Sequence, residues 1–195
     1  MNVKKDFFKD SKIKFPAYEP WISNDDKQIV NKALSQSMLT LGPQLEKFEK
    51  DFCKYSKSKY AVAVSNCTAA LHLSLMALGI KKDDEIIIPD LTFVADANAV
   101  LACNAKPVIT DINQNNFFLS ISNLKKNITK KTKAIIPVHI YGQVCNIEEI
   151  LDVAKDNNLK VIEDCAHAVG TFHKSKHVGT LGNTGCFSFY PTKNI

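Results

Sequence analysis

Two kinds of hydrophobic pattern alternate along this chain. Short continuous apolar runs, such as 86–88 and 134–136, are typical of strands that are buried on both faces. Between such runs, apolar residues recur at helical spacing, as at Leu45, Phe48 and Phe52. Strands that alternate with helices predict a parallel sheet with helices on both of its faces.

Capping and breaking residues set the expected bounds of these elements. Ser23 is a suitable N-cap, Pro43 suits a first helical position, and Gly79 suits a helix end. The first predicted helix starts after its N-cap Ser23 and ends near residue 37. The other predicted helices cover 43–55, 68–78, 93–103, 121–127 and 147–156. The predicted strands cover 60–64, 85–88, 107–110, 134–138, 159–163 and 187–190. Residues 1–22 have no clear period and are expected to be an extended arm, and residues 23–195 one domain.

Composition narrows the class of protein. The 195 residues are 45% hydrophobic and 23% charged, which is typical of a soluble globular chain with a real core. No apolar run approaches the ~20 residues that span a bilayer, and the first residues do not resemble a secretory signal. We therefore expect a cytoplasmic protein without a membrane partner.

The charge pattern does not indicate nucleic-acid binding. The formal net charge is +5, and the lysines are scattered along the chain. Their densest cluster, at 125–133, contains no arginine and no aromatic residue, so a solvated surface is the expected role.

Cysteine and histidine spacing does not predict a metal site. No two of the six cysteines form a C-x-x-C pair, and most lie in apolar runs, so we expect reduced structural thiols. His167, His173 and His177 lie in a segment broken by Gly170 and Gly179, with no matching ligand pair elsewhere.

Ligands of parallel α/β sheets sit at the carboxyl ends of the strands, so the residues that follow each strand are the candidates. The segment 65–70 carries small and hydroxyl residues at a helix start, which suits a phosphate, although Asn66 or Thr68 could simply cap the helix. Phe93 follows the next strand and could stack on a flat ring or be a core aromatic residue.

Two later strand ends carry ionisable groups. Glu163 and Asp164 are adjacent carboxylates at a buried strand end, where burial is unfavourable unless each has a partner. A cationic ring nitrogen would suit one of them, while a salt bridge or a helix cap would be the structural alternative. Lys193 leaves the last apolar run and could act as a nucleophile in a cleft or be an ordinary surface lysine.

Six segments resemble, in order, the DegT/DnrJ/EryC1/StrS family of sugar aminotransferases, which are fold-type I enzymes dependent on pyridoxal 5′-phosphate (PLP). They are PAYEPWIS, MLTLGPQLEKFE, VAVSNCTAALHLSLMALGI, DEIIIPDLTFVADANAV, VIEDCAHAVG and GCFSFYPTKNI, and the resemblance covers roughly residues 15–195. It implies an α/β, three-layer α/β/α domain with a mostly parallel central sheet. This would be the large PLP-binding domain, incomplete at its C-terminus and without the small C-terminal domain.

The resemblance also implies a role for each matching residue. Lys193 matches the Schiff-base lysine, Asp164 the acid that pairs with the pyridinium nitrogen, and His167 the residue at the ring hydroxyl. Phe93 matches the stacking aromatic residue, and Thr68, Ala69 and Ser188 match the phosphate contacts. Glu163 is expected in a supporting contact.

The implied reaction moves an amino group from glutamate to a nucleotide-linked 4-keto-6-deoxy sugar, for surface polysaccharide biosynthesis, in a homodimer. A 3-keto sugar is left open. One alternative is a sugar dehydratase of the same family, although those relatives carry His at the lysine position. A further alternative is an inactive truncated fragment, because the chain stops two residues after Lys193 without a helix stop or turn signal.

Two positions depart from the family pattern. Cys67 stands where glycine is usual and is expected to crowd the phosphate loop. Asp96 stands where a small or hydroxyl residue is usual, and it could alter the sugar pocket or pair with a lysine.

Overall fold

A computed structural model describes residues 20–193, so all but the last three residues of the predicted arm, 1–22, lie outside it. The helices are α1 (Asn24–Leu34), α2 (Pro43–Ser56), α3 (Cys67–Ala77), α4 (Ala95–Ala102), α5 (Ile121–Asn127), the short η1 (Ile140–Gly142) and α6 (Ile147–Asp156). The strands are β1 (Glu85–Pro89), β2 (Lys106–Thr110), β3 (Thr132–Ile135), β4 (Lys160–Asp164), β5 (Phe172–His173), β6 (Lys176–His177) and β7 (Thr184–Cys186).

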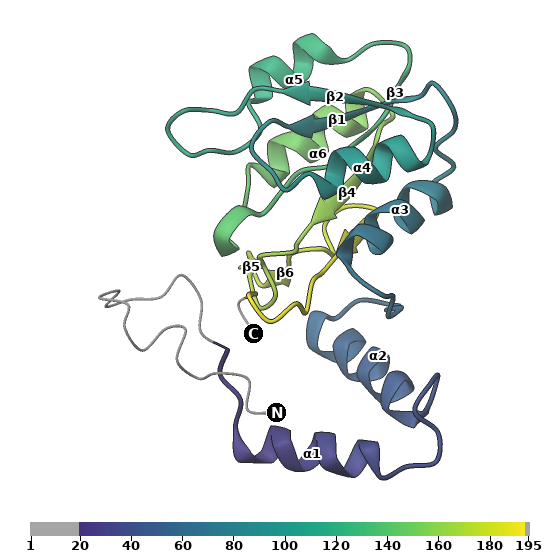
Figure 1. Ribbon diagram of the computed structural model, residues 1–195. Coiled ribbons are helices and arrows are strands. Elements are labelled where there is room, and N and C mark those ends of the chain that lie inside the picture. The colour runs from purple at the N-terminus through teal and green to yellow at the C-terminus, as the bar shows by residue number, and fades with distance from the viewer. Residues whose placement is uncertain (1–19, 194–195) are drawn as a thin grey trace, which may run out of the picture.

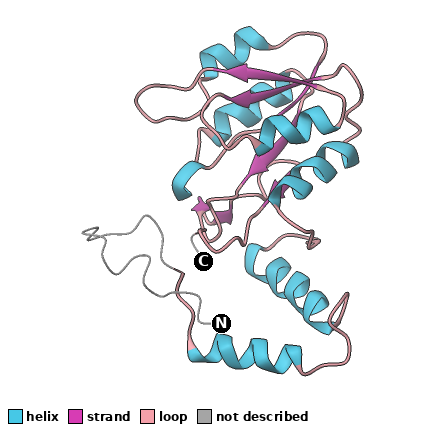
Figure 2. Cartoon of the chain, in the orientation of Figure 1, coloured by secondary structure: helices cyan, strands magenta, loops and turns pink. Residues whose placement is uncertain are grey.

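One parallel sheet organises the chain. Its order is β2-β1-β3-β4-β7, and every neighbouring pair is parallel. Helices lie on both faces of this sheet, and α1 and α2 extend away from it (Figures 1 and 2). The predicted three-layer α/β/α class is therefore confirmed.

Strand side chains divide between two apolar clusters, one on each face of the sheet. In β1, Ile86 and Ile88 pack in the cluster that contains residues of α3 and α4, whereas Ile87 packs in the cluster that contains residues of α5 and α6. Alternate strand side chains point to opposite faces, so a continuous apolar run supplies both layers.

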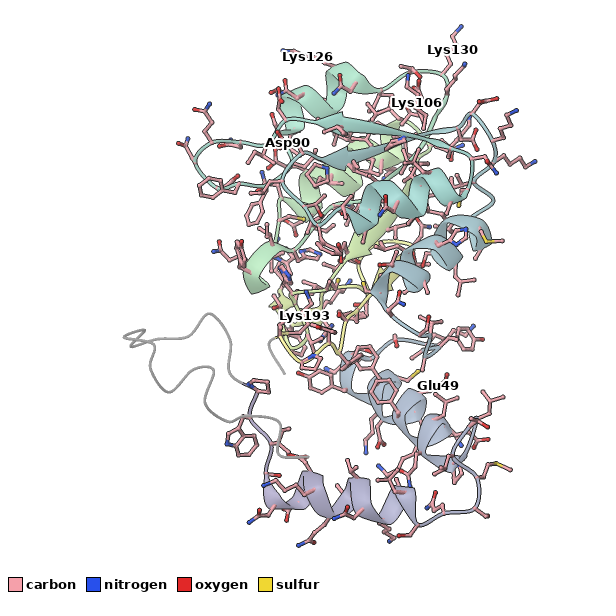
Figure 3. All side chains as sticks on the ribbon, in the orientation of Figure 1. Glu49, Asp90, Lys106, Lys126, Lys130 and Lys193 are labelled. Carbon is pink, nitrogen blue, oxygen red and sulfur yellow. The ribbon has the colours of Figure 1, made fainter. Side chains whose placement is uncertain are left out.

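Three predicted strands differ from the structure. The predicted strand 134–138 is shortened at its end, since β3 ends at Ile135. Residues 60–64 form no strand. Within them, the Ala63 N–H donates to Glu49 Oε1 of α2 at 2.8 Å, and Figure 3 labels Glu49. The last strand is Thr184–Cys186 and not 187–190, because β7 pairs with β4 only as far as the end of β4, where Cys186 faces Asp164. The parallel partner, and not the apolar run, decides where β7 ends.

Local geometry also changes the predicted start of α4. The helix begins at Ala95 and not at residue 93, and the Thr92 hydroxyl donates to the Asp96 side chain, at Oδ2, at 2.6 Å. Ser23 does cap α1, with a capping box closed by Asp26. The β5–β6 hairpin was not predicted, because its turn residues Lys174 and Ser175 adopt positive φ without the usual Gly or Asn.

The six cysteines are free thiols, as predicted from their spacing. In the described part of the chain, every helix is too short or too polar to cross a bilayer.

Candidate active site

Asp164 is the last residue of β4 and is 4% exposed. Its Oδ1 accepts the Ala166 N–H at 2.9 Å, and the Cys67 thiol of α3 lies 3.9 Å from the same atom. The end of β4 and the start of α3 therefore meet at this carboxyl group. Since Cys67 points toward Asp164, its side chain occupies the interior beside the carboxyl group.

Burial acts to raise the pKa of the Asp164 carboxyl above its ordinary value. The Ala166 N–H and the charge of Lys193 oppose this rise, and a protonated His167 would add to them. A cationic group placed against Asp164 would stabilise its ionised form further.

Lys193 lies in the C-terminal segment and is half-buried (Figure 3). Its N–H donates to Tyr190 O at 2.9 Å, which forms a turn directly before the lysine. The charge of Lys193 acts on both Asp164 and His167, so the three side chains that sequence analysis placed in one site share one electrostatic environment.

His167 is held by Tyr141 of η1. The two rings are stacked, with centroids 5.5 Å apart and planes at 15°, and Tyr141 N–H donates to His167 Nδ1 at 3.5 Å. Burial, and then the charge of Lys193, lower the pKa of His167. A neutral ring whose Nδ1 accepts a hydrogen bond carries its proton on Nε2, so His167 can donate from Nε2.

The N-terminus of α3 shows the helix cap that was the structural alternative. Asn66 Oδ1 accepts the Ala69 N–H at 2.9 Å, so this predicted phosphate contact already has a partner. Among residues 20–193 the Thr68 N–H has no hydrogen-bond partner, so it is available at the positive end of the helix dipole. Ser188 Oγ accepts the Tyr190 N–H at 3.4 Å.

A cavity of about 960 Å³ adjoins this end of α3. It is lined by parts of α2, the 57–66 segment, α3 and the 179–191 segment, including Ser188. Asp164, Phe93, His167 and Lys193 do not line it. These four candidate residues therefore lie outside the cavity lining, and the N-terminus of α3 borders both the cavity and Asp164.

Phe93 is 71% exposed, so it is not the core aromatic residue of the structural alternative. Its neighbour Asp96 is completely buried on α4 and contacts Thr92 and Asp164. The expectation that Asp96 pairs with a lysine is wrong for the described residues, because its hydrogen-bonding neighbours are a hydroxyl and a carboxyl group.

Glu163 is a structural residue. Its carboxylate accepts a hydrogen bond from His139 Nε2 at 3.0 Å. It also accepts hydrogen bonds from the N–H groups of Gly179, Leu181 and Gly182 at 2.7–2.8 Å. Burial acts to raise the pKa of Glu163, but the hydrogen bonds from His139 and from the glycine amides outweigh it and lower the pKa. The predicted supporting contact of Glu163 therefore holds the 179–182 loop against β4.

His139 was missed by sequence analysis, although it follows β3 and the search of strand ends could have found it. It forms a buried cluster with Glu163 and Cys165 in which possible metal-ligand atoms lie within 4.8 Å of one another. Nδ1 of His139 accepts the Cys145 N–H at 3.2 Å while Nε2 bonds Glu163, so hydrogen bonds already use both ring nitrogens. Among the described residues this cluster therefore has a structural role, since its hydrogen bonds join β4 to the segment that follows β3.

Comparison with known sequences identifies relatives over nearly the whole chain. A sequence model of the DegT/DnrJ/EryC1/StrS aminotransferase family matches residues 20–195. GDP-perosamine synthase of Escherichia coli O157:H7 is 43% identical over 181 residues, which are 92% of this chain and 50% of the relative. An uncharacterised protein of Methanocaldococcus jannaschii is 45% identical over 92% of this chain and 47% of its own length. The chain thus spans about half the length of the curated relatives it matches.

Solved structures match the fold equally broadly. PseC of Helicobacter pylori, an aminotransferase involved in the biosynthesis of pseudoaminic acid, superposes with a TM-score of 0.87 at 30% identity. The match covers 92% of this chain and 48% of PseC. NtdA of Bacillus subtilis, solved with bound cofactor PMP, matches with a TM-score of 0.82 at 33% identity, over 95% of this chain and 44% of NtdA.

Proposed function

Since the chain belongs to the DegT/DnrJ/EryC1/StrS aminotransferase family, we propose that the whole protein is a PLP-dependent aminotransferase that acts on a nucleotide-linked keto sugar. The observation that carries the proposal is the buried Asp164 carboxyl group at the end of β4, whose ionised form is stabilised by the charge of Lys193. A buried acid without a full complement of donors suits a cationic ring nitrogen.

The donor set of the site fits PLP. Asp164 would face the ring nitrogen, His167 would donate from Nε2 to the ring hydroxyl, and the exposed ring of Phe93 would stack on the cofactor. The Thr68 N–H at the α3 N-terminus and the Ser188 hydroxyl would bind the phosphate. Ala69 would lie next to the phosphate, with its N–H already bonded to Asn66 Oδ1. Lys193 would be the covalent anchor.

When bound, PLP supplies an electron-poor ring that takes up negative charge from the carbon that loses its proton. The chain's own contribution is to place charges and protons around that ring. The Asp164 carboxylate would favour the protonated ring nitrogen. Lys193 Nζ, once released from its covalent bond, would move a proton from the amino-donor carbon to the cofactor and, in the second half of the reaction, from the cofactor to the sugar carbon.

The proposed substrates follow from the relatives' names. The similar protein of Escherichia coli is a GDP-perosamine synthase, and a relative from Bacillus subtilis is a spore coat polysaccharide biosynthesis protein that is 43% identical. We infer glutamate as the amino donor and a nucleotide-linked 4-keto-6-deoxy sugar as the acceptor. The dehydratase alternative is not favoured, because Lys193 stands where those relatives carry His.

A homodimer is the proposed assembly. Helix α1 has no buried residue, and its Ile29, Val30 and Leu34 are exposed. Neighbouring apolar side chains extend the same exposed region: Trp21, Ile22, Met38, Leu39 and Leu41. An apolar surface of this kind is typical of a protein interface, and a second copy would cover it.

The direct test is a coupled assay of the whole protein. Purified protein with PLP, glutamate and a GDP-4-keto-6-deoxy sugar should release 2-oxoglutarate and form an amino sugar with the mass change of replacing a carbonyl oxygen by an amine. Protein with Lys126→Ala, a substitution in the last turn of α5, should behave as wild type. Sugar deoxygenation without transfer of the glutamate nitrogen would favour the dehydratase alternative and contradict the proposal.

A further inference from the structure

Two buried carboxyl groups meet at the centre of the candidate site. Asp96 of α4 is completely buried, and its side chain lies in hydrogen-bonding contact with that of Asp164. Thr92 donates to Asp96 Oδ2 at 2.6 Å, but Oδ1 of Asp96 has no donor if both carboxyl groups are ionised. A hydrogen bond between two carboxyl groups therefore requires a proton on one of them.

The surroundings decide which of the two holds the proton. The ionised form of Asp164 is favoured by the Ala166 N–H, 2.9 Å from Oδ1, and by the charge of Lys193. By contrast, Asp96 has only the neutral Thr92 hydroxyl to favour its ionised form. Desolvation first, and then the charge of Asp164, raise the pKa of Asp96 to about 8.

The other groups around the pair do not supply a competing charge. The thiols of Cys67 and Cys186 interact electrostatically with both carboxyl groups. Burial raises the pKa of Cys186 to about 12 and that of Cys67 above its ordinary value. Both thiols are therefore neutral in the physiological range. The pair consequently carries one proton and one negative charge near neutral pH.

We propose that Asp96 is a positioning residue: a neutral carboxylic acid that donates a hydrogen bond to Asp164 and keeps Asp164 as the single buried anion that faces the cofactor nitrogen. This inference deepens the proposed function and rests on it. Burial makes an isolated Asp164 a stronger base, which would draw the proton from a ring nitrogen. The hydrogen bond from Asp96 weakens that basicity, so the proton stays on the ring.

The first test uses cofactor-free whole protein with ¹³Cγ-labelled aspartate, titrated by NMR. Wild type should show one aspartate carboxyl that titrates near pH 8, and Asp96→Asn should lack it while keeping a donor toward Asp164. In Thr92→Val the same titration should move upward by roughly half a unit to one unit, because a hydrogen bond to the ionised form is lost. Asp152→Asn, an exposed acid of α6, is the matched control and should change nothing in this range.

The inference is overturned if every aspartate titrates below pH 6, or if the high titration persists in Asp96→Asn, which would assign it to Asp164. The Thr92→Val shift keeps the test decisive should Asp96→Asn fail to fold.

A second test reads the ring nitrogen in protein loaded with ¹⁵N-labelled PLP. Wild type and Asp96→Asn should show the shift of a protonated ring, and Asp96→Leu should move at least partly toward the neutral ring. A protonated ring in Asp96→Leu would overturn the inference while leaving the proposed function intact. Failure of wild type to bind PLP would instead overturn the proposed function, whatever the cofactor-free titration shows.

Discussion

Glu163 and Asp164 are adjacent on β4, yet their carboxyl groups serve opposite sides of the sheet. Glu163 is bonded by His139 and the 179–182 loop, whereas Asp164 faces Cys67 and Asp96. The alternation of strand side chains separates the two acids. One therefore stabilises the fold, and the other is free to act on a ligand.

We expect Asp164→Asn to preserve the fold and to reduce turnover by orders of magnitude. The amide has the same shape, so no cavity opens, but the charge that favours a protonated ring is lost. Steady-state kinetics and the unfolding midpoint measure the two effects separately. Near-normal turnover of this variant would exclude the proposed role of Asp164.

Glu163→Gln should instead lower the free energy of unfolding, by about 2–4 kcal/mol, because an amide nitrogen would face backbone N–H groups in a buried site. The pKa of Glu163 is lowered in the folded state. Its contribution is therefore present above the unfolded value of 4.5 and is lost as the pH falls through the folded pKa.

Urea unfolding at pH 7 and at pH 3 tests this prediction. The difference between wild type and Glu163→Gln should shrink at the lower pH, and Glu149→Gln, an exposed acid of α6, should show little difference at either pH. Equal stability of wild type and Glu163→Gln at pH 7 would contradict the structural role.

Lys193→Ala should abolish the covalent adduct that borohydride traps between protein and PLP. Peptide mapping by mass spectrometry locates the modified residue. An adduct that persists on another lysine in the Ala variant would show that Lys193 is not the anchor.

Tyr141→Ala should weaken PLP binding by roughly 2- to 13-fold, since a stacked ring pair contributes about 0.5–1.5 kcal/mol. Burial is the main cause of the lowered pKa of His167, so exposing the imidazole should move its pKa back toward 6.5. PLP titration and His167 NMR measure the two effects. Tyr141→Phe keeps the stack and should match wild type; an unchanged His167 pKa in Tyr141→Ala would contradict the positioning role.

The double variant Val30→Asp/Leu34→Asp should shift the whole protein from dimer to monomer in sedimentation velocity. Both side chains lie on one face of α1 and are exposed, and charges there would be unfavourable in an apolar interface. Lys32→Glu lies on the opposite face and should leave the dimer intact. An active wild-type protein that sediments strictly as a monomer would contradict the proposed assembly.

The sequence by itself determined the α/β class, the parallel sheet and the family. Continuous apolar runs such as Ile86–Ile88 can only be satisfied by burial on both faces, and helical spacing between them supplies the covering layers. The strand-end rule also selected Asp164, because a parallel sheet brings all carboxyl ends to one edge. Lys193 was selected at the end of a strand, 187–190, that the structure does not form. These inferences depend on local periodicity, which a single sequence carries in full.

Only the tertiary structure decided the contacts between segments far apart in the chain. The end of β7 follows from pairing with β4, and the role of Glu163 from a loop that lies 16–19 residues later. The partner of Asp96, in the first turn of α4, is Asp164 at the end of β4, where a lysine had been considered. A carboxyl group looks the same in the sequence whether it meets a lysine, an amide or another acid, and its protonation depends on that neighbour and on the water excluded around it.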